Sequence, residues 1–319
     1  MRNRTSTPQR GFTLIEVLIA LALVTIISLT LLGSLGPWLD FKHELDTQSK
    51  LSDIQQGITA YYTANAMAID SDPATELKPF TPSTVLVGKS CAPQVAAFEA
   101  VSSYMSNSAQ YLSVDGYKQA WCVFVSPPLV ATADGTQLWY RNIAFVSPGR
   151  NGKIDPGTSM SAAGTLTLGG DDKGVLIAGY PIEQQKLTDT LRRMNTVAQA
   201  YGTYFTSRYL AYPDRDVTRD YFSTAWDSAG TVPSTGGNWA PASSALSSLG
   251  LTPTDTLSGW ETNNAIQVGN DTESAAGVTV RSPDTTGTGS LPYTALLRAQ
   301  VPTPGSTPTY TAISVSGSY

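Results

Sequence analysis

Charged residues are scarce in this chain. Only 14% of its 319 residues are Asp, Glu, Lys or Arg, and the formal net charge is -5. No cluster of Lys and Arg interleaved with aromatic residues occurs. Binding of nucleic acid needs such a basic patch, because the phosphates must be neutralised. We therefore expect no nucleic-acid partner.

Residues that build catalytic and metal sites are also few. The chain has one histidine, His43, and two cysteines, Cys91 and Cys122. It contains no Cys-x-x-Cys, Gly-x-Ser-x-Gly, His-Glu-x-x-His or glycine-rich nucleotide loop. The expectation is that the protein is not an enzyme and has no cofactor. An anchored hydrolase is the weakest interpretation, because no motif supports it; a carboxylate pair for glycoside hydrolysis is defined by its separation in space and would not show in the sequence.

The two cysteines have two interpretations. In an oxidising compartment Cys91 and Cys122 should pair, closing a loop of about 31 residues and stabilising the fold by roughly 3–4 kcal/mol. In a reducing compartment they would remain two buried thiols. The compartment of the globular part therefore decides between the two.

The N-terminus carries the strongest pattern. Residues 1–10 are polar and basic, and an apolar run from Phe12 to Leu35 follows Gly11. As a helix this run would be about 36 Å long, enough to cross a bilayer core of about 30 Å. The basic leader would stay cytoplasmic. An ordinary secretory signal is cleaved after its apolar stretch, whereas Gly11, the one plausible processing site, precedes it.

Glu16 is unusual because it lies inside the apolar run. A carboxylate at that depth costs several kcal/mol unless it is paired or near the interface. Its natural partner is a cation from a neighbouring chain, and cleavage after Gly11 would create one, the α-amino group of Phe12. This pattern favours a role for Glu16 in assembly over a plain membrane anchor.

The segment Arg10-Gly11-Phe12-Thr13-Leu14-Ile15-Glu16-Val17 closely resembles the class III signal of type IV pilins and type II secretion pseudopilins. The resemblance implies that prepilin peptidase cuts after Gly11 and methylates Phe12. It also implies that Glu16 contacts the N-terminus of an adjacent subunit. Expected partners are other pilin subunits, in a homo- or heteropolymer, the peptidase and an inner-membrane assembly platform.

The size of the chain favours a minor pilin of a type IV pilus, held in the inner membrane and then assembled into a surface filament. One alternative is a type II secretion pseudopilin in a periplasmic pseudopilus, although Glu16 argues against the tip subunit, which usually lacks this acid. Another is a membrane-anchored binding protein that never polymerises. Processing at Gly11 separates the filament subunits from the anchored protein.

Beyond the apolar run we predict an α+β fold. Leu45, Leu51, Ile54, Ile58 and Tyr61-Tyr62 follow helical spacing up to about residue 70. Glycine and proline at Gly33, Gly36 and Pro37 suggest a kink in this helix. Strands are predicted at 121–126, 137–146 and 174–178, separated by turn signals. The expected domains are a leader (1–11), a membrane and assembly helix (12–36) and a pilin-like helix-on-sheet module (37–180).

A second amphipathic helix is predicted from about Glu183 to Leu210, with one apolar face. That face is formed by Leu187, Leu191, Met194, Val197, Tyr201, Phe205 and Tyr209. Strands are predicted after it at 264–268, 277–281, 293–299 and 308–315. The order of helix, loop and strands thus occurs twice. We expect residues 181–319 to form a second α+β module, either a pilin-like repeat or an unrelated β-rich domain.

The stretch from Val146 to Asp155, with Gly170-Asp171-Asp172 after it, also resembles a stretch of major pseudopilins, where a loop can hold calcium. The resemblance offers Asn151, Asp155, Asp171 and Asp172 as oxygen ligands for a hard cation. Plain turns also use Asp and Asn next to Gly. Both interpretations, a calcium loop and a set of turns, stay open.

Overall fold

The computed structural model of the protein describes residues 14–72, 79–83, 87–215, 217, 221–222, 239–245, 249–260, 265–269, 274–275, 278–279, 294–305 and 307–319. Within these ranges the side chains of 29–35, 240, 244–245, 274–275 and 278–279 are not described. The fold combines helices with antiparallel sheets, which confirms the mixed α+β expectation.

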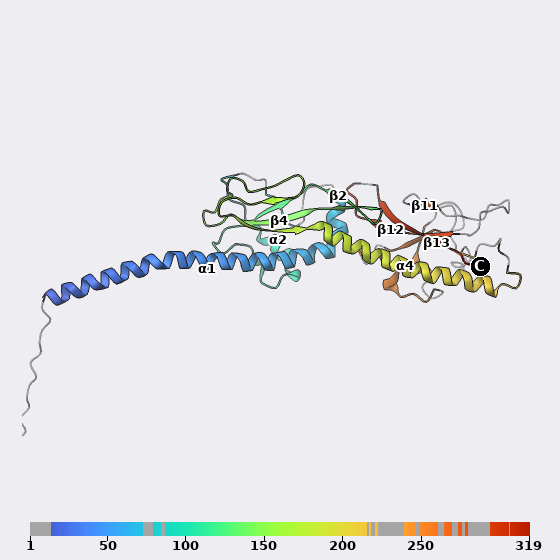
Figure 1. Ribbon diagram of the computed structural model, residues 1–319, viewed down its shortest axis with the longest axis horizontal. Helices are drawn as coiled ribbons and strands as arrows, with labels where there is room; N and C mark the ends of the chain where they lie inside the picture. Colours follow the sequence, from blue (N-terminus) through green and yellow to red (C-terminus); the bar gives the residue numbers. More distant parts are fainter. Residues whose placement is uncertain are drawn as a thin grey trace, which may run out of the picture.

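Helix α1 (Leu14–Ser71) is the longest element, and its second half forms one side of the first core (Figure 1). Its buried residues recur every three or four positions, so they share one face. They are Leu51, Ile54, Ile58, Tyr62, Ala66 and Ile69. The predicted face was wrong at Leu45, which is 49% exposed. Thr47, two positions later, is buried and accepts a hydrogen bond from the Gly116 amide, so Leu45 lies on another face of α1.

The backbone stays helical at Gly33, Gly36 and Pro37, the residues that suggested a kink. Helix α1 continues through this proline, and its one non-helical residue is Asn65 (φ -120°, ψ 17°). The Asn65 side chain donates to the Tyr61 carbonyl at 2.9 Å, a local bond that competes with the helical pattern. The helix therefore bends close to its C-terminal end.

Strands β1 (Cys122–Val125), β4 (Asn142–Ser147) and β7 (Lys173–Ala178) form the first sheet, in the antiparallel order β1-β4-β7. One face of β4 presents Ile143 and Phe145 to the first core. The opposite face presents Ala144 and Val146 to a smaller cluster. This alternation, with both faces covered, explains why β4 reads as a continuous apolar run.

Helix α4 (Gly179–Ala211) follows β7 directly and repeats the arrangement. Its buried residues Met194, Val197, Tyr201 and Phe205 belong to a second core. The sheet over this core has the antiparallel order β13-β12-β9-β8. Its strands are β8 (Ala240–Pro241), β9 (Gln267–Gly269), β12 (Thr294–Val301) and β13 (Thr309–Ser316). Figure 1 shows α1 and α4 following one another along the molecule, with both sheets on the same side.

Short elements complete the fold. The helical ones are α2 (Val95–Ala100), η1 (Ser102–Tyr104), α3 (Ala109–Leu112), η3 (Ala242–Ala245) and η4 (Pro253–Thr256). The two-stranded ones are β2 (Leu129–Ala133) with β3 (Thr136–Tyr140), β5 (Ser159–Met160) with β6 (Leu166–Thr167), and β10 (Ser274–Ala275) with β11 (Val278–Thr279).

The two helix–sheet bodies share buried contacts. The first core includes Ile182 and Leu187 of α4, and also Trp260 and Val301 from the second half of the chain. A buried hydrogen bond of 2.9 Å joins the hydroxyl groups of Thr136 on β3 and Thr311 on β13. The first core thus contains residues from both sides of position 180, and a pilin-like origin of the second body stays a prediction.

Candidate functional site

Glu16 lies in the first turn of α1. Residues 14–28 are exposed, and most of them are apolar, for example Leu14 (82%) and Ile15 (67%). An exposed apolar surface of this extent normally contacts a membrane or another protein. Gly11 and Phe12, the predicted processing site, lie outside the described residues.

None of the helices in the described part of the chain is both long and apolar enough to span a membrane. The predicted span over 12–36 is therefore not confirmed. Part of it, residues 12–13 and the side chains of 29–35, lies outside the description.

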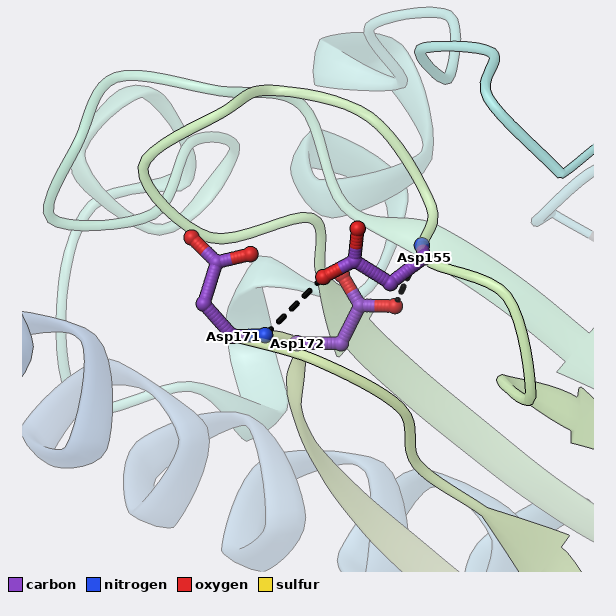
Figure 2. Close-up of side chains that lie close together, drawn as sticks. All are labelled: Asp155, Asp171 and Asp172. Atoms are coloured by element: carbon purple, nitrogen blue, oxygen red, sulfur yellow. Dashed lines mark hydrogen bonds between the residues drawn. The ribbon is translucent and has the colours of Figure 1, made fainter.

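A second candidate site is the loop between β4 and β7, which brings three carboxylates together (Figure 2). The loop leaves β4 after Ser147, which pairs with Lys173 at the start of β7. Asp171 and Asp172 come just before β7, and Asp155 faces them from the earlier part of the loop. One oxygen from each of these three residues lies within 4.8 Å of the others.

Backbone amides hold the three carboxylates in place. The Asp171 amide donates to Oδ2 of Asp155 at 2.9 Å, and the Asp155 amide donates to Oδ2 of Asp172 at 2.9 Å. The Arg150 amide donates to Oδ2 of Asp171 at 2.8 Å. Hydrogen bonds to the ionised form stabilise it, so the bonds from Asp171, from its backbone first, lower the pKa of Asp155.

Asp172 is the buried member of the cluster. Its Oδ2 also accepts a 2.6 Å hydrogen bond from the Thr158 hydroxyl. The residue is only 4% exposed. Its Oδ1 is buried and has no hydrogen-bond partner among the described residues. Burial raises the pKa of this carboxyl, and the nearby carboxylates of Asp155 and Asp171 act in the same direction. A buried carboxylate oxygen without a partner is costly.

The carboxylates fit a hard cation. Calcium takes oxygen ligands at about 2.3–2.6 Å, so ligands on opposite sides of the ion lie about 5 Å apart. The observed separation of at most 4.8 Å is compatible with this value. Asn151 is placed differently from the prediction, because its amide nitrogen donates to Asp155 and Asp171 at 3.0 Å. Its oxygen accepts from the Lys153 amide instead, so Asn151 offers no oxygen to this cluster.

Two ion pairs connect this loop region to helix α1. Arg150 contacts Asp40 at 2.6 Å, and Lys173 contacts Glu44 at 3.2 Å. Both pairs are partly exposed, so each contributes at most about 1 kcal/mol. They place the carboxylate cluster beside the stretch of α1 that enters the globular part.

The structure joins Cys91 and Cys122 in a disulfide, with the two Cα atoms 5.3 Å apart. Cys122 is fully buried on β1, and the bond ties the segment before α2 to the first sheet. This is the pairing expected for an oxidising compartment.

Sequence reasoning missed a group of buried polar residues between the two bodies. Asp70, at the end of α1, and Glu183, in the first turns of α4, are 1% and 0% exposed. Tyr62, Arg141 and Trp260 surround them. No sequence signal indicated this group, because its members come from four distant segments.

Residues 6–32 match the model of the prokaryotic N-terminal methylation motif. This motif is the class III signal peptide of type IV pilins and pseudopilins, so the chain carries that signal as predicted. No curated protein and no solved structure matches the chain. The matched residues end within α1, before the globular part begins.

Proposed function

We propose that this protein is a subunit of a type IV pilus, and more specifically a minor pilin, assembled through its N-terminal helix after processing by prepilin peptidase. The methylation motif at residues 6–32 carries the proposal. The motif points to a structural, membrane-associated precursor that assembles with other pilin subunits. Cleavage after Gly11 and methylation of Phe12 are the expected processing steps.

The exposed surface of α1 supports assembly. Residues 14–28 leave apolar side chains in contact with solvent on every side of the helix. Packing this helix against others would bury that surface, which stabilises by about 25 cal/mol per Å². Glu16 would neutralise the N-terminal ammonium group of a neighbouring subunit and fix the register of the helices. Before assembly the same segment would be held in the inner membrane, with the assembly platform as partner.

The N-terminus and intact mass of the protein, purified from cells with and without prepilin peptidase, test this proposal. A chain that begins at N-methylated Phe12 only when the peptidase is present supports a filament subunit. A chain that keeps residues 1–11 would refute it and leave an anchored binding protein. Deletion of the gene then separates a pilus from a pseudopilus, through loss of surface filaments or of secretion.

We also infer a calcium site formed by Asp155, Asp171 and Asp172. The partnerless Oδ1 of Asp172 is the observation that favours it, because a bound cation would supply the missing partner. Calcium would stabilise the loop beside α1, as a structural ion. If a chelator left the melting temperature of the full chain unchanged, this inference would be wrong.

A further inference from the structure

The contact between the two helix–sheet bodies contains two buried carboxyl groups, Asp70 and Glu183. Asp70 lies in the last turn of α1, and Glu183 lies in the first turns of α4. The two groups affect each other's pKa, and the Tyr62 hydroxyl that contacts Asp70 also lies beside Gly179, one helical turn before Glu183. Both lie in the region where the first core receives Leu187 and Trp260 from the second half of the chain.

Each carboxyl has one strong neutral donor. The Tyr62 hydroxyl lies 2.8 Å from both oxygens of Asp70 and accepts the Arg141 amide at 2.9 Å. The Trp260 indole donates to Oε2 of Glu183 at 2.5 Å. Oε1 of Glu183 is buried without a hydrogen-bond partner of good geometry within the described residues. The carboxyl of Asp70 is the group beside it that can supply a proton.

Burial raises the pKa of both carboxyl groups by more than Arg141 lowers that of Asp70 and Lys186 lowers that of Glu183. The groups around the pair are Tyr62 from α1, Asp72 just after α1, Arg141 from between β3 and β4, and Lys186 from α4. The Arg141 guanidinium donates to the Asp72 carbonyl, while its Nε and Nη1 have no partner in the part of the chain that the structure describes. In the same part, neither carboxylate forms an ion pair within 4 Å. Two adjacent buried carboxylates cannot both ionise at low cost.

We propose that Asp70 and Glu183 share a proton and act as a pH-sensitive latch between the two bodies. With the proton in place, the carboxyl groups bridge the end of α1 to the start of α4, and Trp260 closes the contact from the second body. Ionisation of Glu183 as the pH rises places a negative charge in this buried contact beside Asp70, which weakens the contact between the ends of the two helices.

The raised pKa values of the two carboxyl groups determine how the stability of the native state depends on pH. Burial raises the pKa of Glu183 to about 7, against an ordinary value of 4.5, and raises that of Asp70 as well. The native state therefore keeps a proton that the unfolded state has released. The stabilisation is fully present below about pH 4.5 and is lost as the pH rises through about 7. The pair titrates as a unit, so these values describe the pair.

The test compares the full chain in detergent micelles with two variants, by urea unfolding between about pH 5 and about pH 9. Glu183→Gln removes the charge but keeps an oxygen for Trp260 and an amide donor for Asp70. Asp189→Asn is the matched control, because Asp189 lies on the same helix and its side chain is 38% exposed. As the pH rises from about 5 to about 9, the folding equilibrium constants of the wild type and of Asp189→Asn should each fall on the order of a hundredfold more than that of Glu183→Gln.

Two further readouts keep the latch testable if Glu183→Gln fails to fold. Infrared spectroscopy of the wild type near pH 7 should show a protonated carboxyl band that disappears as the pH rises. Hydrogen exchange of the wild type, corrected for the intrinsic effect of pH, should accelerate at residues 62–71 and 179–187 before residues 295–299 of β12. Parallel pH profiles for wild type and Glu183→Gln, or no protonated carboxyl near pH 7, would overturn the proposal.

Discussion

Replacing Asp172 with Asn tests the calcium loop at the atom on which it depends. The change is isosteric and keeps an oxygen to accept from the Asp155 amide and the Thr158 hydroxyl. It exchanges the partnerless Oδ1 for an NH2 group, which cannot bind a cation. The variant therefore removes one calcium ligand while leaving the hydrogen bonds that shape the loop.

The expected size of the effect follows from mass action. Calcium at about 100 times its dissociation constant stabilises the native state by about 2.7 kcal/mol. With an unfolding entropy of about 2.1 cal/mol/K per residue, each kcal/mol corresponds to about 1.5 °C for a chain of 319 residues, so we expect a shift of roughly 4 °C in the wild type. In Asp172→Asn the shift should fall to about 2 °C or less, because the buried ligand is lost.

Without calcium, Asp172→Asn should no longer be less stable than the wild type. Burial raises the pKa of Asp172, so its ionised form destabilises the calcium-free native state above that pKa. Removing the charge should make Asp172→Asn at least as stable as the wild type in a chelator. The increment from calcium should grow as the pH rises, since binding requires the carboxylate.

Differential scanning fluorimetry of the full chain in detergent, with calcium or with a chelator, measures both effects. Asp134→Asn is the control: Asp134 lies in the β2–β3 turn with φ 47°, a conformation that Asn also tolerates. It should keep the full calcium shift. Equal calcium shifts in the wild type and Asp172→Asn would refute the assignment of this oxygen as a ligand.

Three further predictions concern other parts of the chain. Glu16→Leu should still be cleaved and methylated, but should enter filaments poorly, as immunoblots of sheared filaments would reveal; normal incorporation would contradict the assembly role. Changing both Cys91 and Cys122 to Ala should lower the free energy of unfolding by roughly 3–4 kcal/mol in urea titrations, given the sequence separation of 31; a change below about 1 kcal/mol would contradict this value. Gly179→Ala should lower the free energy of unfolding by more than about 2 kcal/mol, because a Cβ there would lie 2.3 Å from the Arg141 carbonyl oxygen and the Tyr62 hydroxyl. Gly202→Ala is the control: its Cβ would meet its nearest atom at 3.9 Å, so this change should be neutral or slightly stabilising.

Local patterns in the sequence were enough to locate the two long helices and several strands. The predicted strand 137–146 was wrong, because it is two strands, β3 (Thr136–Tyr140) and β4 (Asn142–Ser147), in separate sheets. The second predicted helix, Glu183 to Leu210, corresponds to α4 (Gly179–Ala211), and the predicted strand 174–178 corresponds to β7 (Lys173–Ala178). Helix and strand periodicity are set by neighbours a few positions apart, so one chain shows them directly. The methylation motif is local in the same sense.

Details that depend on packing were predicted less well. Leu45 was placed on the buried face but is 49% exposed, because the face of α1 that contacts the globular part here is the one with Thr47. Asn151 was expected as an oxygen ligand, yet its amide nitrogen faces the carboxylates. The orientation of an amide depends on which donors and acceptors surround it, and composition does not specify them.

The sequence by itself determined the N-terminal signal, the order of helices and strands and the two cysteines available to pair. The resemblance had already grouped Asp155 with Asp171 and Asp172. The tertiary structure alone decided that Asp70 lies near Glu183, and that Oδ1 of Asp172 has no hydrogen-bond partner among the described residues. The physical reason is the range of the interactions. Spacing along a helix or strand is repeated locally, whereas a contact between distant carboxyl groups depends on how whole elements pack and on which charges the surrounding side chains leave uncompensated.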